Sequence, residues 1–169
     1  MVDSKEAIHD LLTDAFTRLI EHVDQLTDGL SENMATYRPT PEANTIAWLL
    51  WHSARVQDAQ VADVAGVDQV WKGWVERFAL ELPDDDTGYG HSAQDVGKVR
   101  ASAELLAGYY RGVHEMTLTY LAELDADELE RVIDENWDPP VTAGVRLVSV
   151  IDDCAQHLGQ AAYVRGIAP

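Results

Sequence analysis

The sequence predicts an all-α protein built as a four-helix bundle, with one domain over residues 1–169. Apolar residues recur at three- and four-residue spacing in four long segments, near 4–27, 45–65, 93–124 and 143–165. No segment predicts a convincing strand, and the chain contains no internal repeat. The 46% hydrophobic content is enough for the core of one domain, whereas two domains would be cramped in this length.

The first helix is bounded by signals at both of its ends. Asp3 and Glu6 have the spacing of a capping box, in which the two side chains satisfy backbone N–H groups at a helix start. Gly29 follows the last apolar position and is typical of a helix stop. Residues 30–43 contain two prolines, so we expect a connection there.

The second helix is expected to begin after Asn44, which can cap it, and to end near Gly66. Beyond it the pattern is less regular. Residues 70–78 could form a short helix that carries two tryptophans. The segment PDDDTGYGHS then reads as a loop, because it combines three acidic residues with two glycines. A loop of this size in a small domain is often functional.

The last two helices carry cap signals of their own. Ser92 and Asp95 have the spacing of another capping box, and the apolar pattern predicts one continuous helix from there to about residue 124. A short helix and an extended segment are expected over 125–141. Thr142 can cap the last helix, which we expect to end at Gly166. The long connections leave the order of helix directions open.

Composition excludes several classes of function. The net charge of −18 repels phosphate backbones, so we expect neither nucleic-acid binding nor attachment to anionic membranes. No apolar run approaches the roughly 20 residues of a membrane span. The polar N-terminal segment lacks a signal-peptide pattern, so the expected compartment is the cytoplasm. Cys154 is the only cysteine, which excludes an internal disulfide and is typical of a core residue.

Three side chains form a candidate metal site. His52 lies in an apolar stretch of the second helix, beside Trp48. Asp153 and His157 are four residues apart and therefore project from one face of the last helix, within an apolar stripe. A buried carboxylate costs free energy unless it is paired or bound to a metal. A divalent ion could offset that cost with His52 as a third ligand, whereas the simpler alternative is an Asp–His hydrogen bond or a partly exposed face.

Two motifs carry a resemblance to a known family. NTIAWLLWHSARVQD resembles the second-helix motif of the DinB-like (DinB/YfiT) superfamily, in which a histidine follows an Asn–small–Ile–Ala–Trp start. DDCAQHLGQAAYVRG resembles the last-helix motif, which usually has two histidines four residues apart followed by Gly and Gln. The segment ERFALELPDDDTGYGHS is similar to a loop of actinobacterial members. The resemblance spans nearly the whole chain.

The resemblance implies a bundle with a three-histidine metal site at one end. Carried over by position, His52 is the first ligand and His157 the third. Asp153 takes the second position, where the family usually has histidine. Two imidazoles and one carboxylate still bind divalent ions, so zinc is expected, with nickel, manganese or iron as alternatives. Asp152 points about 100° away on the helix and is the less suitable carboxylate.

Four further residues are candidates for substrate binding or for supporting the ligands. His91 follows TGYG and could enter the mouth of the site, or could simply belong to a loop or cap. Gln160 could support His157 or contact substrate. Arg55 could bind a substrate carboxylate, although a salt bridge within this acidic chain is the alternative. Trp48 is also a candidate, with a plain core role as the alternative.

The resemblance also implies thiol chemistry. Several DinB-like proteins are similar to transferases that use a low-molecular-weight thiol such as mycothiol or bacillithiol. We therefore expect a metal-dependent S-transferase that joins such a thiol to a small electrophile. The alternatives are a non-catalytic, stress-linked protein that binds a metal or small molecule, and a metal-dependent hydrolase. We also expect a homodimer, because helix faces rich in Trp and Tyr exceed what one small bundle can bury.

Overall fold

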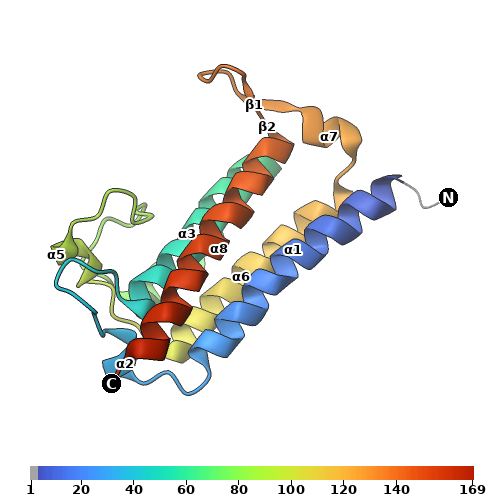
Figure 1. Ribbon diagram of the computed structural model, residues 1–169. Coiled ribbons are helices and arrows are strands. Elements are labelled where there is room, and N and C mark those ends of the chain that lie inside the picture. Colours follow the sequence, from blue (N-terminus) through green and yellow to red (C-terminus); the bar gives the residue numbers. More distant parts are fainter. Residues whose placement is uncertain (1–3) are drawn as a thin grey trace.

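The computed structural model describes residues 4–169 and consists mainly of four long helices. These are α1 (Ser4–Thr27), α3 (Ile46–Ala65), α6 (Ala103–Glu123) and α8 (Ala143–Ile167). Helix α1 packs against α6 and α8, and α3 packs against the same two helices. Following the chain in Figure 1, α1 and α8 run in one direction and α3 and α6 in the other. The predicted all-α bundle is confirmed, and its order of directions is now defined.

Most helix boundaries follow the predicted signals, with two corrections. Thr45, not Asn44, caps α3, because its hydroxyl accepts a hydrogen bond of 3.0 Å from the Trp48 N–H. Thr142 caps α8 as predicted. Helix α8 does not end at Gly166 but continues to Ile167, and the guanidinium of Arg165 donates to backbone carbonyls at the end of α1. The capping box expected at Asp3 lies outside the described residues.

The predicted third helix is interrupted, which corrects the expectation of one continuous helix. A single turn, α5 (Ala93–Val96), carries the expected capping box of Ser92 and Asp95. The chain then leaves the helical path, and the Ser102 hydroxyl accepts a hydrogen bond from the Leu105 N–H to start α6. The interruption lets α5 lie outside the bundle, where the Arg38 guanidinium of the loop before α3 donates to the Ala93 carbonyl, whereas α6 joins the bundle (Figure 1).

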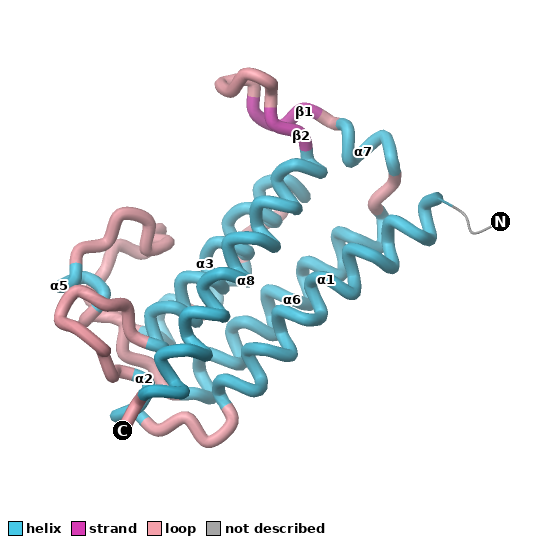
Figure 2. The backbone as a smooth tube through the Cα atoms, viewed as in Figure 1, coloured by secondary structure: helices cyan, strands magenta, loops and turns pink. Residues whose placement is uncertain are grey.

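Shorter elements occupy the connections. They are α2 (Glu32–Ala35), the 3₁₀ turn η1 (Val70–Gly73) and α4 (Val75–Phe78). Figure 2 shows that the connection from α3 to α6 is mostly loop and lies beside the bundle on the α3 side. The short helix predicted over 70–78 is therefore two separate turns. No helix among residues 4–169 is both long and apolar enough to cross a membrane.

The connection from α6 to α8 contains a strand pair that the sequence did not predict. Helix α7 (Ala126–Glu130) is followed by β1 (Val132–Asp134) and β2 (Val141–Thr142), which pair antiparallel. Strands of two or three residues are too short to show an alternating pattern in the sequence. This pair stands at the end of the bundle where α8 begins (Figure 2).

Candidate metal centre

His52 is held in one orientation by a backbone carbonyl. It lies in the N-terminal half of α3, and only 5% of its surface is exposed. Its Nδ1 is 2.5 Å from the carbonyl oxygen of Thr87. A carbonyl can only accept, so Nδ1 carries the proton and Nε2 keeps its lone pair. Metal-binding histidines commonly have this arrangement, with the second nitrogen bonded to a backbone carbonyl or carboxylate.

Asp153 and His157 meet His52 from α8, which packs against α3. The ring centroids of His52 and His157 are 4.7 Å apart. One ligand atom from each of the three residues lies within 4.8 Å of the others. His52 thus converges with two side chains that lie about a hundred positions later in the sequence, as the carried-over ligand set requires.

The three residues fit a divalent cation. Asp153 Oδ2 and His157 Nδ1 are both buried and form no hydrogen bond with any described residue. Buried polar atoms without a partner cost free energy, and native structures rarely leave them so. A cation coordinated by these atoms would satisfy them, and two imidazoles with a carboxylate are a competent donor set. These three residues could therefore hold a divalent metal ion.

Electrostatics keep His52 in the form that binds metal. Burial lowers its pKa below the usual value, and the imidazoles of His157 and His91 act in the same direction. The hydrogen bond to Thr87 and the charge of Asp153 oppose this effect and are outweighed. The neutral imidazole is the species that coordinates a metal, so His52 does not need to lose a proton at neutral pH.

The carbonyl that orients His52 is itself fixed on both sides. Arg55 Nε donates to the Asp86 carbonyl at 3.0 Å, immediately before Thr87. Immediately after Thr87, the Gly88 N–H donates to the Asp86 carboxylate at 2.8 Å. Burial acts to raise the pKa of Asp86, but hydrogen bonds from His91 and Gly88 outweigh it and leave the pKa below its usual value. Asp86 therefore stays a charged acceptor at neutral pH.

Gly88 is required by both its conformation and its surroundings. Its φ of +92° lies in a region that other residues rarely adopt. A Cβ at this position would be 2.9 Å from His52 Nδ1, 3.0 Å from Trp51 and 3.1 Å from Trp48. The backbone approaches the histidine so closely that no side chain fits between them.

His91 lies beside the candidate site, and both of its ring nitrogens are occupied. Trp48 Nε1 donates to His91 Nδ1 at 3.0 Å, and His91 Nε2 then donates to the Asp86 carboxylate at 2.8 Å. Trp48 also stacks on His52, with ring centroids 4.5 Å apart and planes 12° apart. Both residues thus support the candidate ligand His52, and neither lines the cavity in front of it.

Arg55 forms the internal salt bridge that was the alternative to a substrate contact. It is 1% exposed, and its guanidinium lies 3.5 Å from the buried carboxylate of Asp58. Its Nη1 also donates to the Gln69 side chain and to the Tyr109 hydroxyl. With these partners, Arg55 holds the connection between α3 and α6 against the bundle.

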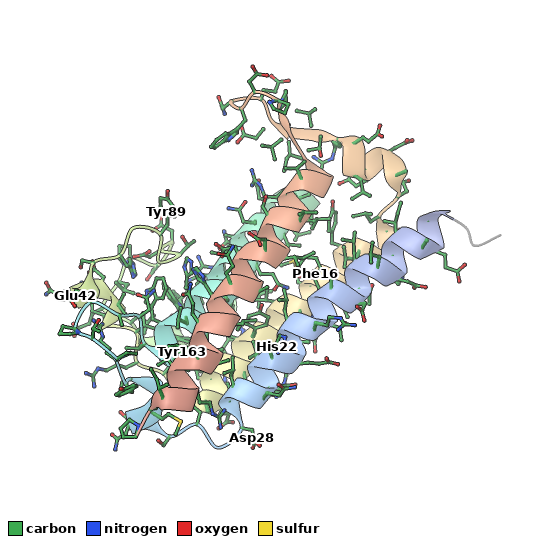
Figure 3. All side chains as sticks on the ribbon, viewed as in Figure 1. Phe16, His22, Asp28, Glu42, Tyr89 and Tyr163 are labelled. Atoms are coloured by element: carbon green, nitrogen blue, oxygen red, sulfur yellow. The ribbon has the colours of Figure 1, made fainter. Side chains whose placement is uncertain are left out.

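A cavity of about 460 Å³ opens onto His52 and Asp153. It lies between α3, α8 and the loop after α4, and its lining residues are His52, Val56, Gln60, Thr87, Tyr89, Arg146, Ser149, Val150 and Asp153. Tyr89 is 93% exposed on that loop, where Figure 3 labels it. A larger groove of about 650 Å³ lies between α1 and α8, away from the candidate ligands. Two of the three candidate ligands therefore line the smaller cavity and not the larger groove.

The remaining predicted residues lie elsewhere. Gln160 is exposed and borders a separate hollow with Asn44 and Tyr163, so the structure does not bring it to the cavity. Asp152 is exposed and accepts a hydrogen bond from Gln156, which agrees with its expected direction away from the site. Cys154 is fully buried, as a core residue should be.

Two features of the site were not predicted from the sequence. The Thr87 carbonyl has no side-chain signal, and only the flanking Asp86 and Gly88 in the segment PDDDTGYGHS could have pointed to it. Arg146 was also missed, although it lies seven residues before Asp153 and hence two turns away on one helix face.

Comparison with known proteins identifies the family. The sequence model of the family described as Mycothiol-S-transferase matches residues 11–168. A solved structure, described as the crystal structure of the conserved protein of locus from Enterococcus faecalis, is similar to this chain with 36% sequence identity and a TM-score of 0.87. That similarity covers 94% of this chain and 95% of the other. A search of curated proteins finds no match. The family match covers nearly the whole chain, which therefore belongs to the mycothiol-S-transferase family, a DinB-like family.

Proposed function

We propose that this chain joins a low-molecular-weight thiol of the mycothiol type to a small electrophile, with the help of a divalent metal ion. The observation that carries the proposal is the convergence of His52, Asp153 and His157, with unpartnered buried atoms, next to an open cavity. The family match supports the mycothiol-related transferase activity.

When bound to the three side chains, the ion would hold the thiol sulfur and lower its pKa, so that the thiol reacts as a thiolate. The chain's own residues prepare for this role. The Thr87 carbonyl fixes the His52 tautomer, and the Trp48 ring covers one face of that imidazole. A cavity of about 460 Å³ lies within the usual size range of small-molecule sites and leaves room for the electrophile.

Zinc is the metal that we propose first, since it accepts two histidines and one carboxylate with an open fourth position. Asp153 brings one negative charge to the donor set. This charge favours harder ions more than three imidazoles would, so nickel, manganese and iron are the alternatives.

No nucleophile of the protein is needed, and the single cysteine is unsuited to be one. Burial raises the pKa of the Cys154 thiol to about 12, so the thiolate is scarce at neutral pH. Its sulfur is 3.4 Å from the Ser53 carbonyl inside the core. The attacking sulfur therefore comes from the small thiol.

Metal-assisted hydrolysis is less well supported, because it needs a base near the metal-bound water. His91 is a histidine beside the three candidate ligands, within 6.1 Å of Trp48 between ring centroids. Trp48 donates to one of its nitrogens, and the other donates to Asp86. Since neither nitrogen is free to accept a proton, the geometry offers no base at this position.

The test is a conjugation assay with the purified, zinc-loaded chain. Mycothiol, bacillithiol or glutathione is combined with a panel of electrophiles, and conjugates are detected by mass spectrometry. We expect conjugates above the rate without protein, loss of activity with a chelator, and recovery with a divalent ion. Cys154→Ser should retain activity, whereas His52→Ala should lose most of it. If no conjugate forms, or if Cys154→Ser abolishes turnover, the proposal is wrong and a non-catalytic binding role replaces it.

We also propose a homodimer, on different grounds from those the sequence offered. Three of the tryptophans that were expected to form an exposed apolar surface are buried, at positions 48, 51 and 71. Exposed apolar side chains occur instead on α1 and α8, at Leu11 (71% exposed), Val148 (63%) and Tyr163 (69%). Light scattering at micromolar concentration should give twice the mass of one chain, and a monomeric mass would contradict this proposal.

A further inference from the structure

Arg146 lies at the other end of the cavity that opens onto His52 and Asp153. It projects from α8 seven residues before Asp153. Because an α-helix rises 1.5 Å per residue, the two positions are about 10 Å apart along the axis. A molecule that touches both ends of the cavity must therefore span several bonds between its reacting atom and whatever group Arg146 holds.

The guanidinium of Arg146 is only partly engaged by the protein. Its Nη1 donates to the side-chain oxygen of Gln60, which also lines the cavity. Its Nη2 is 3.9 Å from the Asp134 carboxylate, too far for a hydrogen bond. Asp134 instead accepts hydrogen bonds from Asn136. Since a guanidinium has five N–H donors, most of those of Arg146 remain available within the described part of the chain.

Charge makes this position unusual. The chain carries a net charge of −18, so an anionic molecule is repelled by most of the surface. Among the described residues that line the cavity, Arg146 is the only lysine or arginine, and its side chain is 20% exposed. Arginine binds carboxylates in a planar, two-point arrangement that gives both strength and orientation. The Gln60 amide NH₂ can add a further donor beside it.

We propose that the cavity selects a carboxylate-bearing electrophile, with Arg146 binding the carboxylate and the reactive carbon directed toward His52 and Asp153. That the bound electrophile reacts with a thiol rests on the function proposed above, whereas the preference of the cavity for a carboxylate does not. For a benzyl halide, the thiolate sulfur forms a C–S bond as the C–Cl bond breaks. Chloride leaves with the electron pair, and the thiol proton passes to solvent. Arg146 is a specificity-determining residue, since it holds a group that does not react.

The first test measures binding without catalysis. The probes are 4-methylbenzoate and 4-methylbenzamide, which have similar shape and differ in charge, titrated into the zinc-loaded chain by calorimetry. We expect the wild type to bind the acid about tenfold or more tightly than the amide, because a charge-assisted hydrogen bond is lost with the amide. Arg146→Gln should remove this preference and Arg146→Lys should keep part of it. Equal binding of the two probes by the wild type would overturn the proposal.

A matched control separates the local contact from overall charge. Arg111→Gln changes the net charge by the same amount, but Arg111 lies on α6 and is paired with Asp24 on the surface. The preference for the acid should survive in this variant. If Arg111→Gln removed it as fully as Arg146→Gln does, the effect would be one of net charge and the proposal would fail.

The second test asks which reactant carries the carboxylate. Conjugation rates are compared for 4-(chloromethyl)benzoate and 4-(chloromethyl)benzamide, with mycothiol, which has no carboxylate, and with glutathione, which has two. Arg146→Gln should slow the acid electrophile about tenfold with either thiol and leave the amide unaffected. An effect that followed glutathione instead would place the carboxylate on the thiol and overturn this assignment. If no conjugates form while the wild type still prefers 4-methylbenzoate, the transferase proposal fails and the anion-binding role of Arg146 stands.

Discussion

The connection over residues 66–102 and the connection over residues 124–142 both join two bundle helices, but they are attached in different ways. In the first, the fully buried carboxylate of Asp58 accepts hydrogen bonds from the N–H groups of Val70 and Trp71. In the second, one link to the bundle is Arg131, whose side chain is 45% exposed and donates to the Val64 carbonyl. Figure 2 shows the first connection alongside α3 and the second beyond the end of the bundle.

The difference shows how a chain with few regular elements outside its bundle can still build a rigid site. Buried polar groups must find partners, so a network of them permits only one placement of the segment that it holds. The first connection supplies the Thr87 carbonyl that orients His52, and it is the one that is fixed in this way. The second approaches the lining of the cavity at Asp134, whose carboxylate is 3.9 Å from Arg146.

The largest effect is expected at the two arginines that link the connections to the bundle, Arg55 on α3 and Arg131 in the second connection. Arg55→Met should lower the free energy of unfolding by about 3–5 kcal/mol, since it leaves the buried carboxylate of Asp58 without its ion-pair partner. Arg131→Met should cost about 1 kcal/mol or less, because its ion pair with Glu128 is partly exposed to water. Urea unfolding of the two variants measures both values. Equal costs would contradict the proposed difference between the connections.

A smaller effect, on metal binding, is expected at two glycines of the same loop. Gly88→Ala should weaken zinc affinity by roughly 10–100-fold, because the added methyl displaces His52 from its carbonyl partner. Gly90→Ala is the matched control: its φ is +73°, so it bears a similar backbone strain, but no atom lies within 4 Å of the added carbon. Zinc titration with a competing chelator compares them. If both variants lost zinc affinity to the same extent, backbone strain in the loop would explain the loss, and the proposed contact with His52 would not.

The smallest effect is expected at the tip of the second connection. Trp137 is 66% exposed, so Trp137→Ala should change the free energy of unfolding by about 0.5 kcal/mol or less and leave zinc affinity unchanged. Thermal unfolding and zinc titration measure the two quantities. A marked loss of zinc affinity would show that the strand pair takes part in the site.

The four long helices could be predicted because their apolar side chains follow the helical period closely. The break before α6 could not, since Val96 and Val99 continue that period and are both buried although the helix is interrupted between them. Asp153 and His157 could be paired from their spacing on one helix. Their meeting with His52 could be suggested from its apolar surroundings, with an Asp–His hydrogen bond as the alternative, and the family resemblance pointed to the same residue. The Thr87 carbonyl could not be predicted, because every residue has a backbone carbonyl whatever its type.

The central claim is that His52, Asp153 and His157 hold one divalent ion. It is tested most directly by the zinc content of the purified wild type and of His157→Ala, measured after dialysis against zinc and then buffer. The wild type should retain about one ion per chain. His157→Ala should retain almost none while its helical circular dichroism stays unchanged, since the substitution removes a ligand but little apolar packing. Equal zinc content in the two proteins would show that another residue supplies the site and would contradict the claim.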